Sequence, residues 1–141
     1  MNIDDEIENI ISNIKENEYD SLNDIEELRT LAIDKVFSNF MRYENNIQNK
    51  IIAEKELQTF EFIDVNDLQK GDFIRYFNLR FFFDLKLVIG GTVLNTNFND
   101  SGDILILAPY GVKRIKPNIF FKRIKTDDLF KMKLIQIANS V

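Results

Sequence analysis

Residues 67 to 77, Asp-Leu-Gln-Lys-Gly-Asp-Phe-Ile-Arg-Tyr-Phe, contain a turn followed by a short strand. Gly71 lies where the turn needs a positive φ angle, and the aromatic and β-branched side chains of residues 73–77 favour an extended backbone. From Thr59 onward the apolar residues recur with a period of two, whereas before it they recur every three or four residues. This change predicts an acidic helical segment over residues 1–58 and a basic β domain over residues 59–141.

Four further short strands are predicted downstream of this stretch. The first of them, residues 86–94, carries Gly90 and Gly91 in its middle, where they allow the bulge by which a small sheet closes on itself. Residues 60–65 read as a lead-in strand or an extended segment. The other three strands are predicted over residues 104–108, 112–116 and 119–124. Five short strands with tight turns favour a small SH3-like barrel, so the expected fold class is α+β.

The segment before residue 59 has two apolar stripes with helical spacing. Ile3, Ile7, Ile10 and Ile14 predict a first helix, and a longer stripe after Ser21 contains no Pro or Gly. The longer stripe predicts one long helix to about residue 56, with a break near residues 44–50 as an alternative because Asn is a poor helix former.

The apolar face of this long helix must be buried against another surface. A helical hairpin with the first helix would supply it within the chain, and packing against another subunit, as in a coiled coil, would supply it between chains. The stripe residues expected to bind a partner are Leu28, Ala32, Val36, Phe40, Tyr43 and Ile47. At the other end of the chain, Thr126-Asp127-Asp128 predicts the N-terminus of a short closing helix.

The charges divide at the same place as the periodicity. Residues 1–64 carry 16 acidic and 6 basic side chains, a net charge of −10, and residues 65–141 carry 7 acidic and 12 basic ones, a net charge of +5. Each part is therefore expected to attract partners of the opposite charge. No signal peptide or membrane-spanning stretch is predicted, since the N-terminus is acidic and no long uncharged apolar run occurs.

The composition argues against catalysis. The chain has no Cys and no His, so a cysteine nucleophile, the usual general base and the commonest metal ligand are all missing. A metal-dependent enzyme using Asp72 or Asp103 is not expected, because neither residue lies in a dense acidic cluster. We expect no catalytic residue, no metal and no cofactor.

Part of the β domain resembles a known group of proteins. The runs Leu68–Phe77, Gly90–Leu94, Val112–Lys116 and Asn118–Lys122 resemble small β-barrel, virion-associated proteins of large double-stranded DNA viruses. The resemblance covers residues 68–123. It implies a minor capsid protein or another virion component without catalytic activity, located in the virion or in the host cytoplasm.

Two function classes follow. The first is a structural or interaction protein that docks on neighbouring subunits, either viral capsid proteins or further copies of itself. The alternative is a nucleic-acid-binding module, because basic residues are interleaved with Phe120 and Phe121. Its expected basic face consists of Arg75, Arg80, Lys113, Arg114, Lys116, Lys122, Arg123 and Lys125. In a strand, however, at least one of the two phenylalanines must point into the core, which favours the first class.

Overall fold

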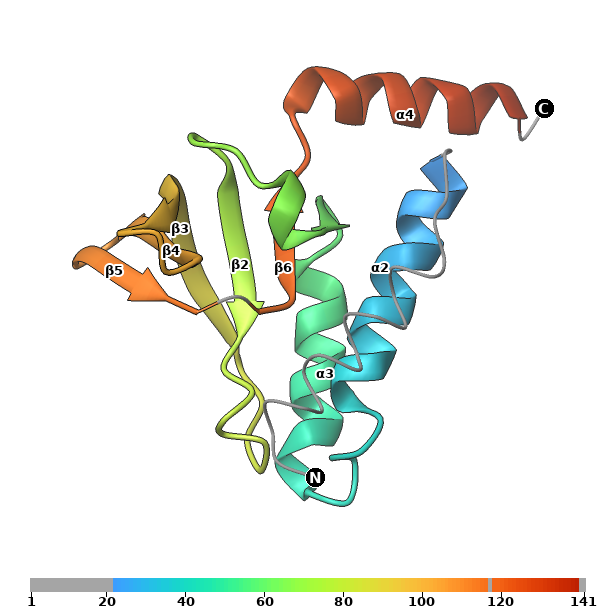
Figure 1. Ribbon diagram of the computed structural model, residues 1–141. Coiled ribbons are helices and arrows are strands. Elements are labelled where there is room, and N and C mark those ends of the chain that lie inside the picture. The colour runs from blue at the N-terminus through green and yellow to red at the C-terminus, as the bar shows by residue number, and fades with distance from the viewer. Residues whose placement is uncertain (1–21, 117, 140–141) are drawn as a thin grey trace.

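The computed structural model describes residues 22–116 and 118–139 (Figure 1). Within these residues two helices come first, α2 (Leu22–Phe37) and α3 (Glu44–Glu56). The predicted first helix over residues 3–14 and the expected helix start at Ser21 lie outside the described residues. The elements that follow are β1 (Phe60–Ile63), the 3-10 turn η1 (Val65–Asp67), β2 (Phe73–Phe77), β3 (Leu87–Phe98), β4 (Asp103–Ala108), β5 (Gly111–Ile115), β6 (Phe120–Arg123) and α4 (Thr126–Asn139).

The predicted five-stranded SH3-like barrel is wrong. In the described part of the chain, six strands form one antiparallel sheet in the order β1-β6-β2-β3-β4-β5, and this sheet is open, with β1 and β5 at its two edges. The extra strand is β1, which the sequence left as either a strand or an extended segment. It pairs with β6, placing Phe60 opposite Arg123 and Ile63 opposite Phe120. Periodicity shows which residues share a face, whereas this pairing between distant segments depends on the whole fold.

The predicted long second helix is also wrong. α2 ends at Phe37, residues 38–43 form turns, and α3 begins at Glu44, so the break comes before the Asn-rich stretch. The spacing of Phe40 and Tyr43 fits a helical stripe, but both side chains pack from the turns against the core. Figure 1 shows the result, in which α2 and α3 form a pair beside the sheet.

Two hydrophobic clusters hold the sheet, one on each face. The first joins the helices to the sheet, and the second fills the opposite face, where the strands curl. Residues of the first cluster are Ala32, Ile33, Val36, Phe37, Phe40, Ala53, Leu57, Phe60, Phe77, Leu79, Leu85, Ile119 and Phe121. Residues of the second are Ile63, Leu68, Ile74, Tyr76, Val93, Ile104, Ile106, Ala108 and Phe120. Fully burying one such large side chain stabilises a fold by about 1.5–3 kcal/mol.

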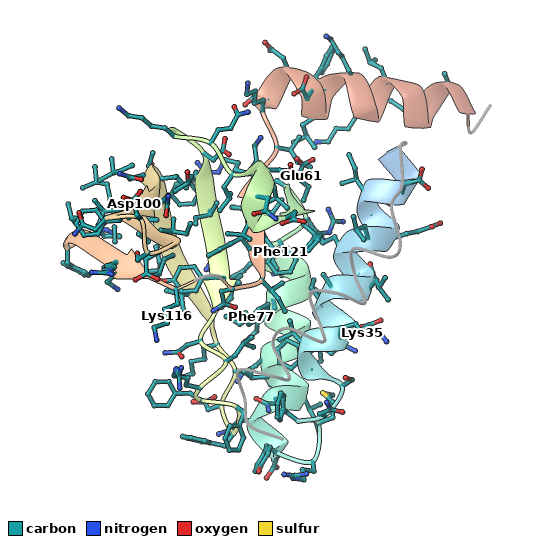
Figure 2. All side chains as sticks on the ribbon, viewed as in Figure 1. Lys35, Glu61, Phe77, Asp100, Lys116 and Phe121 are labelled. Atoms are coloured by element: carbon teal, nitrogen blue, oxygen red, sulfur yellow. The ribbon has the colours of Figure 1, made fainter. Side chains whose placement is uncertain are left out.

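The contact of β2 and β6 with α2 depends on one aromatic group. The ring of Phe77 lies edge-on to that of Phe37, with centroids 5.3 Å apart, and edge-on to that of Phe121, with centroids 6.1 Å apart. Figure 2 labels Phe77 and Phe121 where these strands meet the helices. Edge-to-face pairs add a small attraction beyond the area that they bury, so this group helps to hold α2 against the sheet.

The C-terminal helix α4 lies apart from both clusters. Among its described side chains only that of Leu129 is half-buried, and the others are exposed, including Phe130 and Leu134. Figure 1 shows α4 crossing one end of the molecule rather than covering the sheet. Among the described helices, none is long and apolar enough to cross a membrane.

Candidate interaction surface

The helices cover only part of the sheet face on their side. β2 directs Phe73 and Phe77 toward this side, where both pack with the first cluster. The strand register extends the same face outward, because Phe73 pairs with Thr92, Thr92 with Leu107, and Leu107 with Val112. Directly opposed residues of antiparallel strands project to one face. Leu107 and Val112 therefore lie on the helix side, yet they are 52% and 58% exposed, and Figure 1 shows α2 and α3 away from β4 and β5.

An open groove separates α3 from the start of β3. Its volume is about 310 Å³. Two isoleucines on opposite sides of it are largely exposed, Ile52 of α3 at 44% and Ile89 of β3 at 61%. The lining residues are Asn49, Ile52, Glu56, Arg75, Lys86, Leu87 and Ile89. The groove thus combines apolar sides with a few charged groups, a composition common in binding sites.

We refer to Ile52, Ile89, Leu107 and Val112 together as the open face. Within its groove, the guanidinium of Arg75 is held in place, because its Nε donates to the Val88 carbonyl at 3.1 Å. The same guanidinium lies 3.3 Å from a carboxylate oxygen of Glu56. A charge held this way can orient a polar group of a partner while the isoleucines supply apolar contact.

The position of α3 beside the groove depends on Asn46. This side chain is fully buried. Its amide nitrogen donates to the carbonyls of Phe40 and Phe82 at 2.8 and 2.7 Å, and its oxygen accepts from the Leu85 amide at 2.8 Å. Asn46 therefore ties the start of α3 to the turns before it and to the loop between β2 and β3.

That loop carries an aromatic run that sequence reasoning missed as a surface feature. Phe82 packs against Phe40 and Tyr43, with ring centroids 5.6 and 5.8 Å apart. Phe81 and Phe83 are exposed and contact each other edge-on. The run itself was the available signal, because three consecutive aromatic residues cannot all point into one core.

The helical stripe predicted to bind a partner is mostly used inside the molecule. Ala32, Val36 and Phe40 are buried, and Leu28 and Tyr43 pack against the same cluster. The remaining member of the stripe, Ile47, is exposed on α3. The structure thus brings five of the six stripe residues against the sheet.

The structure does not gather the predicted basic face into one surface. On the helix side of the sheet, Arg75 pairs with Glu56, and Arg123 stacks over the ring of Phe73 at 4.1 Å. Lys122 projects to the opposite face, where its ammonium lies 3.6 Å from Asp72.

The other predicted basic residues lie elsewhere. Arg80 belongs to the loop between β2 and β3, and Lys125 precedes α4. Lys113, Arg114 and Lys116 lie in or next to β5, the far edge of the sheet. Figure 2 shows Lys116 on the opposite side of the view from Lys35 of α2. Three strands separate β5 from β6, so no compact cationic patch contains both groups.

One half-buried carboxylate lies at the edge of the second cluster. Glu61 of β1 is directly opposite Lys122 of β6. Burial raises the pKa of Glu61, the nearby Lys122 opposes that shift, and Asp128 and Asp72 add to it. Burial likewise raises the pKa of Tyr76 on the same face of the sheet.

No group of three or more acidic side chains that could hold a metal ion occurs within the described residues. The described surface offers apolar area flanked by the charges of Glu56, Arg75 and Lys86. Comparison of the chain with protein-family models, curated proteins and solved structures found no match.

Proposed function

We propose that this chain is a non-catalytic interaction protein that binds another protein through the open face. The observation that carries this proposal is the set of large apolar side chains left uncovered on the helix side of β3, β4 and β5. None of these side chains belongs to either hydrophobic cluster. Exposed apolar side chains that gather on one side of a protein often mark the surface to which a partner binds.

The surroundings of the open face support a protein partner. Glu56, Arg75 and Lys86 supply charges at the groove, as the polar rim does in protein interfaces. The exposed phenylalanines of the loop before β3 add aromatic area, which is enriched where proteins bind proteins. The absence of His and Cys from the sequence agrees with a role without catalysis.

A narrower proposal concerns where the partner is found. Residues 68–123 resemble small proteins of large double-stranded DNA viruses, so we propose a minor virion component that contacts capsid subunits or further copies of itself. Its location would be the virion or the host cytoplasm. The open sheet departs from the barrel of that resemblance, so this narrower proposal rests on the sequence motifs alone.

Capture of partners by immobilised protein tests the broader proposal. We expect the wild-type chain to retain a partner from its native source that an Ile89→Asp, Leu107→Asp variant does not retain. Phe130→Asp is the matched control, because it places a carboxylate at an exposed apolar position of α4. Circular dichroism should show that all three chains are folded.

Two results would contradict the proposal. One is a chain that is strictly monomeric in analytical ultracentrifugation and captures nothing. The other is a partner that is lost equally from the Phe130→Asp control, which would place binding outside the open face.

A further inference from the structure

The two edges of the sheet differ in their protection. β1 is covered, because α2 packs beside it and Arg29 of α2 donates from Nη1 to the carbonyls of Gln58 and Phe60 at 3.1 Å each. Partial burial lowers the pKa of the Arg29 guanidinium. An arginine that occupies edge carbonyls blocks the approach of another strand.

Within residues 22–116 and 118–139, the opposite edge, β5, has no such cover. Its only strand neighbour in this part of the chain is β4, and its residues 111–114 are exposed while Ile115 is half-buried. Among the described residues, no backbone hydrogen bond beyond the pairing with β4 involves this strand. No proline interrupts Gly111–Ile115, so the strand keeps the amide groups that a further strand would use.

The charges on β5 indicate which strand it would accept. Arg114 is already paired, since its Nε lies 2.6 Å from a carboxylate oxygen of Asp103 and its guanidinium stacks over Phe98. For Lys113 and Lys116, the described part of the chain supplies no ion pair. Lysines on an edge discourage pairing with an identical strand, because two copies would bring like charges together, but the same lysines attract an acidic strand.

The faces of β5 specify an alternating pattern. Val112 is opposite Leu107 on the open face, and Lys113 is opposite Ile106 on the other face of the sheet. A strand laid beside β5 would therefore place apolar side chains next to Val112 and carboxylates next to Lys113.

Building on the proposed function, we propose that the edge of β5 binds an extended acidic segment of a partner protein as a seventh strand. The segment alternates apolar and acidic residues. Its backbone pairs with β5, its apolar side chains extend the contact with the open face, and its carboxylates pair with Lys113. Lys116, one residue beyond the end of the strand, adds positive charge that attracts the acidic segment.

A synthetic peptide of alternating Val and Glu, with blocked ends, is the probe. Amide hydrogen exchange of the full chain, followed by NMR, should show slowed exchange of the β5 amides when the peptide is added. Lys113→Glu, Lys116→Glu should weaken binding about tenfold or more, because each substitution turns attraction into repulsion. The control Lys131→Glu, Lys133→Glu changes the net charge equally on exposed positions of α4 and should bind as the wild type does.

The strand proposal is overturned if the peptide leaves β5 exchange unchanged, if a Val and Lys peptide binds equally well, or if both double variants lose binding to the same extent. Protection of β5 that appears with rising protein concentration alone would also overturn it, since the occupant would then be a second copy. If β5 fails these tests while partner capture still depends on Leu107, the strand proposal fails and the proposed function stands.

Discussion

Asn46 shows how a single polar side chain sets the geometry of the candidate surface. It lies fully buried with all three of its hydrogen bonds made to backbone groups of other segments. An apolar residue at the same place would leave two carbonyls and one amide without partners. Asn is a poor helix former, so the start of α3, Glu-Asn-Asn, is stabilised by these tertiary contacts rather than by helix propensity.

Asn46→Ala should lower the free energy of unfolding by roughly 3 kcal/mol or more, because each buried group left unpaired costs about 1–3 kcal/mol. Urea denaturation measures the change. Asn49→Ala is the control, since it removes one partly buried bond to Asp84, and should cost about 1 kcal/mol. Equal losses in the two variants would contradict the role given to Asn46.

Glu61 makes a prediction about pH. Its folded-state pKa is raised, chiefly by burial, so at pH values between its ordinary value of 4.5 and the raised one the folded chain binds more protons than the unfolded chain. The free energy of unfolding should therefore fall as the pH rises through that window. Glu61→Gln should remove this fall and stabilise the protein slightly at neutral pH.

The control for Glu61 is Glu54→Gln at an exposed position of α3. Thermal unfolding across the pH range compares the two. A stability profile of Glu61→Gln that keeps the wild-type slope would show that another group causes it.

At the scale of elements, β3 contains two glycines that lie close against the backbone of its neighbours β2 and β4. A Cβ atom at Gly90 would lie 1.9 Å from the Ile74 carbonyl oxygen, and one at Gly91 would lie 2.3 Å from the Leu107 carbonyl oxygen. The register of β2 and β3 shifts at this point, which agrees with the bulge predicted for the glycine pair. Because both clashes are with backbone of paired strands, they cannot be relieved without breaking the sheet.

Gly90→Ala and Gly91→Ala should each lower the free energy of unfolding by roughly 3 kcal/mol or more. Gly102→Ala is the matched control, because Gly102 has a φ of +80° but a Cβ atom added there would meet nothing within 4 Å, and it should cost about 1 kcal/mol. Equal free energies of unfolding for all three variants would contradict this account. They would mean that glycine is needed for its backbone conformation rather than for its close approach to neighbouring strands.

The helix α4 should be dispensable for the fold. Its described side chains contribute to neither cluster, so a chain that ends at Lys125 should unfold cooperatively, with a free energy of unfolding within about 1 kcal/mol of the full-length value. Circular dichroism and urea denaturation test this. A loss of cooperative unfolding would show that α4 supports the sheet.

The sequence predicted elements better than their arrangement. The strands at residues 73–77 and 104–108 and the closing helix after Lys125 followed from local signals, namely alternation, turn glycines and a helix cap. The break between α2 and α3 did not follow from local signals. The spacing of Phe40 and Tyr43 matches a helical stripe even though both residues lie in turns. Local signals also did not predict the pairing of β1 with β6, which adds a sixth strand. Nor did they predict that the edge strands β1 and β5 of the described sheet stay unpaired with each other, which leaves the sheet open.

At the scale of the whole molecule, the sequence likewise indicated the apolar residues of the candidate surface but not which of them the rest of the chain would bury. The stripe from Leu28 to Ile47 was recognised as apolar, but its cover turned out to be mostly the chain's own sheet. Ile89 and Leu107 alternate like core residues, so their exposure depends on where the helices stop. Within the described residues, no side chain of α2 or α3 forms an ion pair with β5, which lies at one edge of the sheet.

Amide hydrogen exchange of the full chain, alone and with its captured partner, is the decisive test of binding at the open face. We expect binding to slow exchange in residues 87–89 and 104–116, which carry the open face of the sheet and its free edge. Exchange at α4 and at the covered edge β1 should stay unchanged. Slowed exchange confined to α4 or to β1, with none in β4 and β5, would contradict binding at this face.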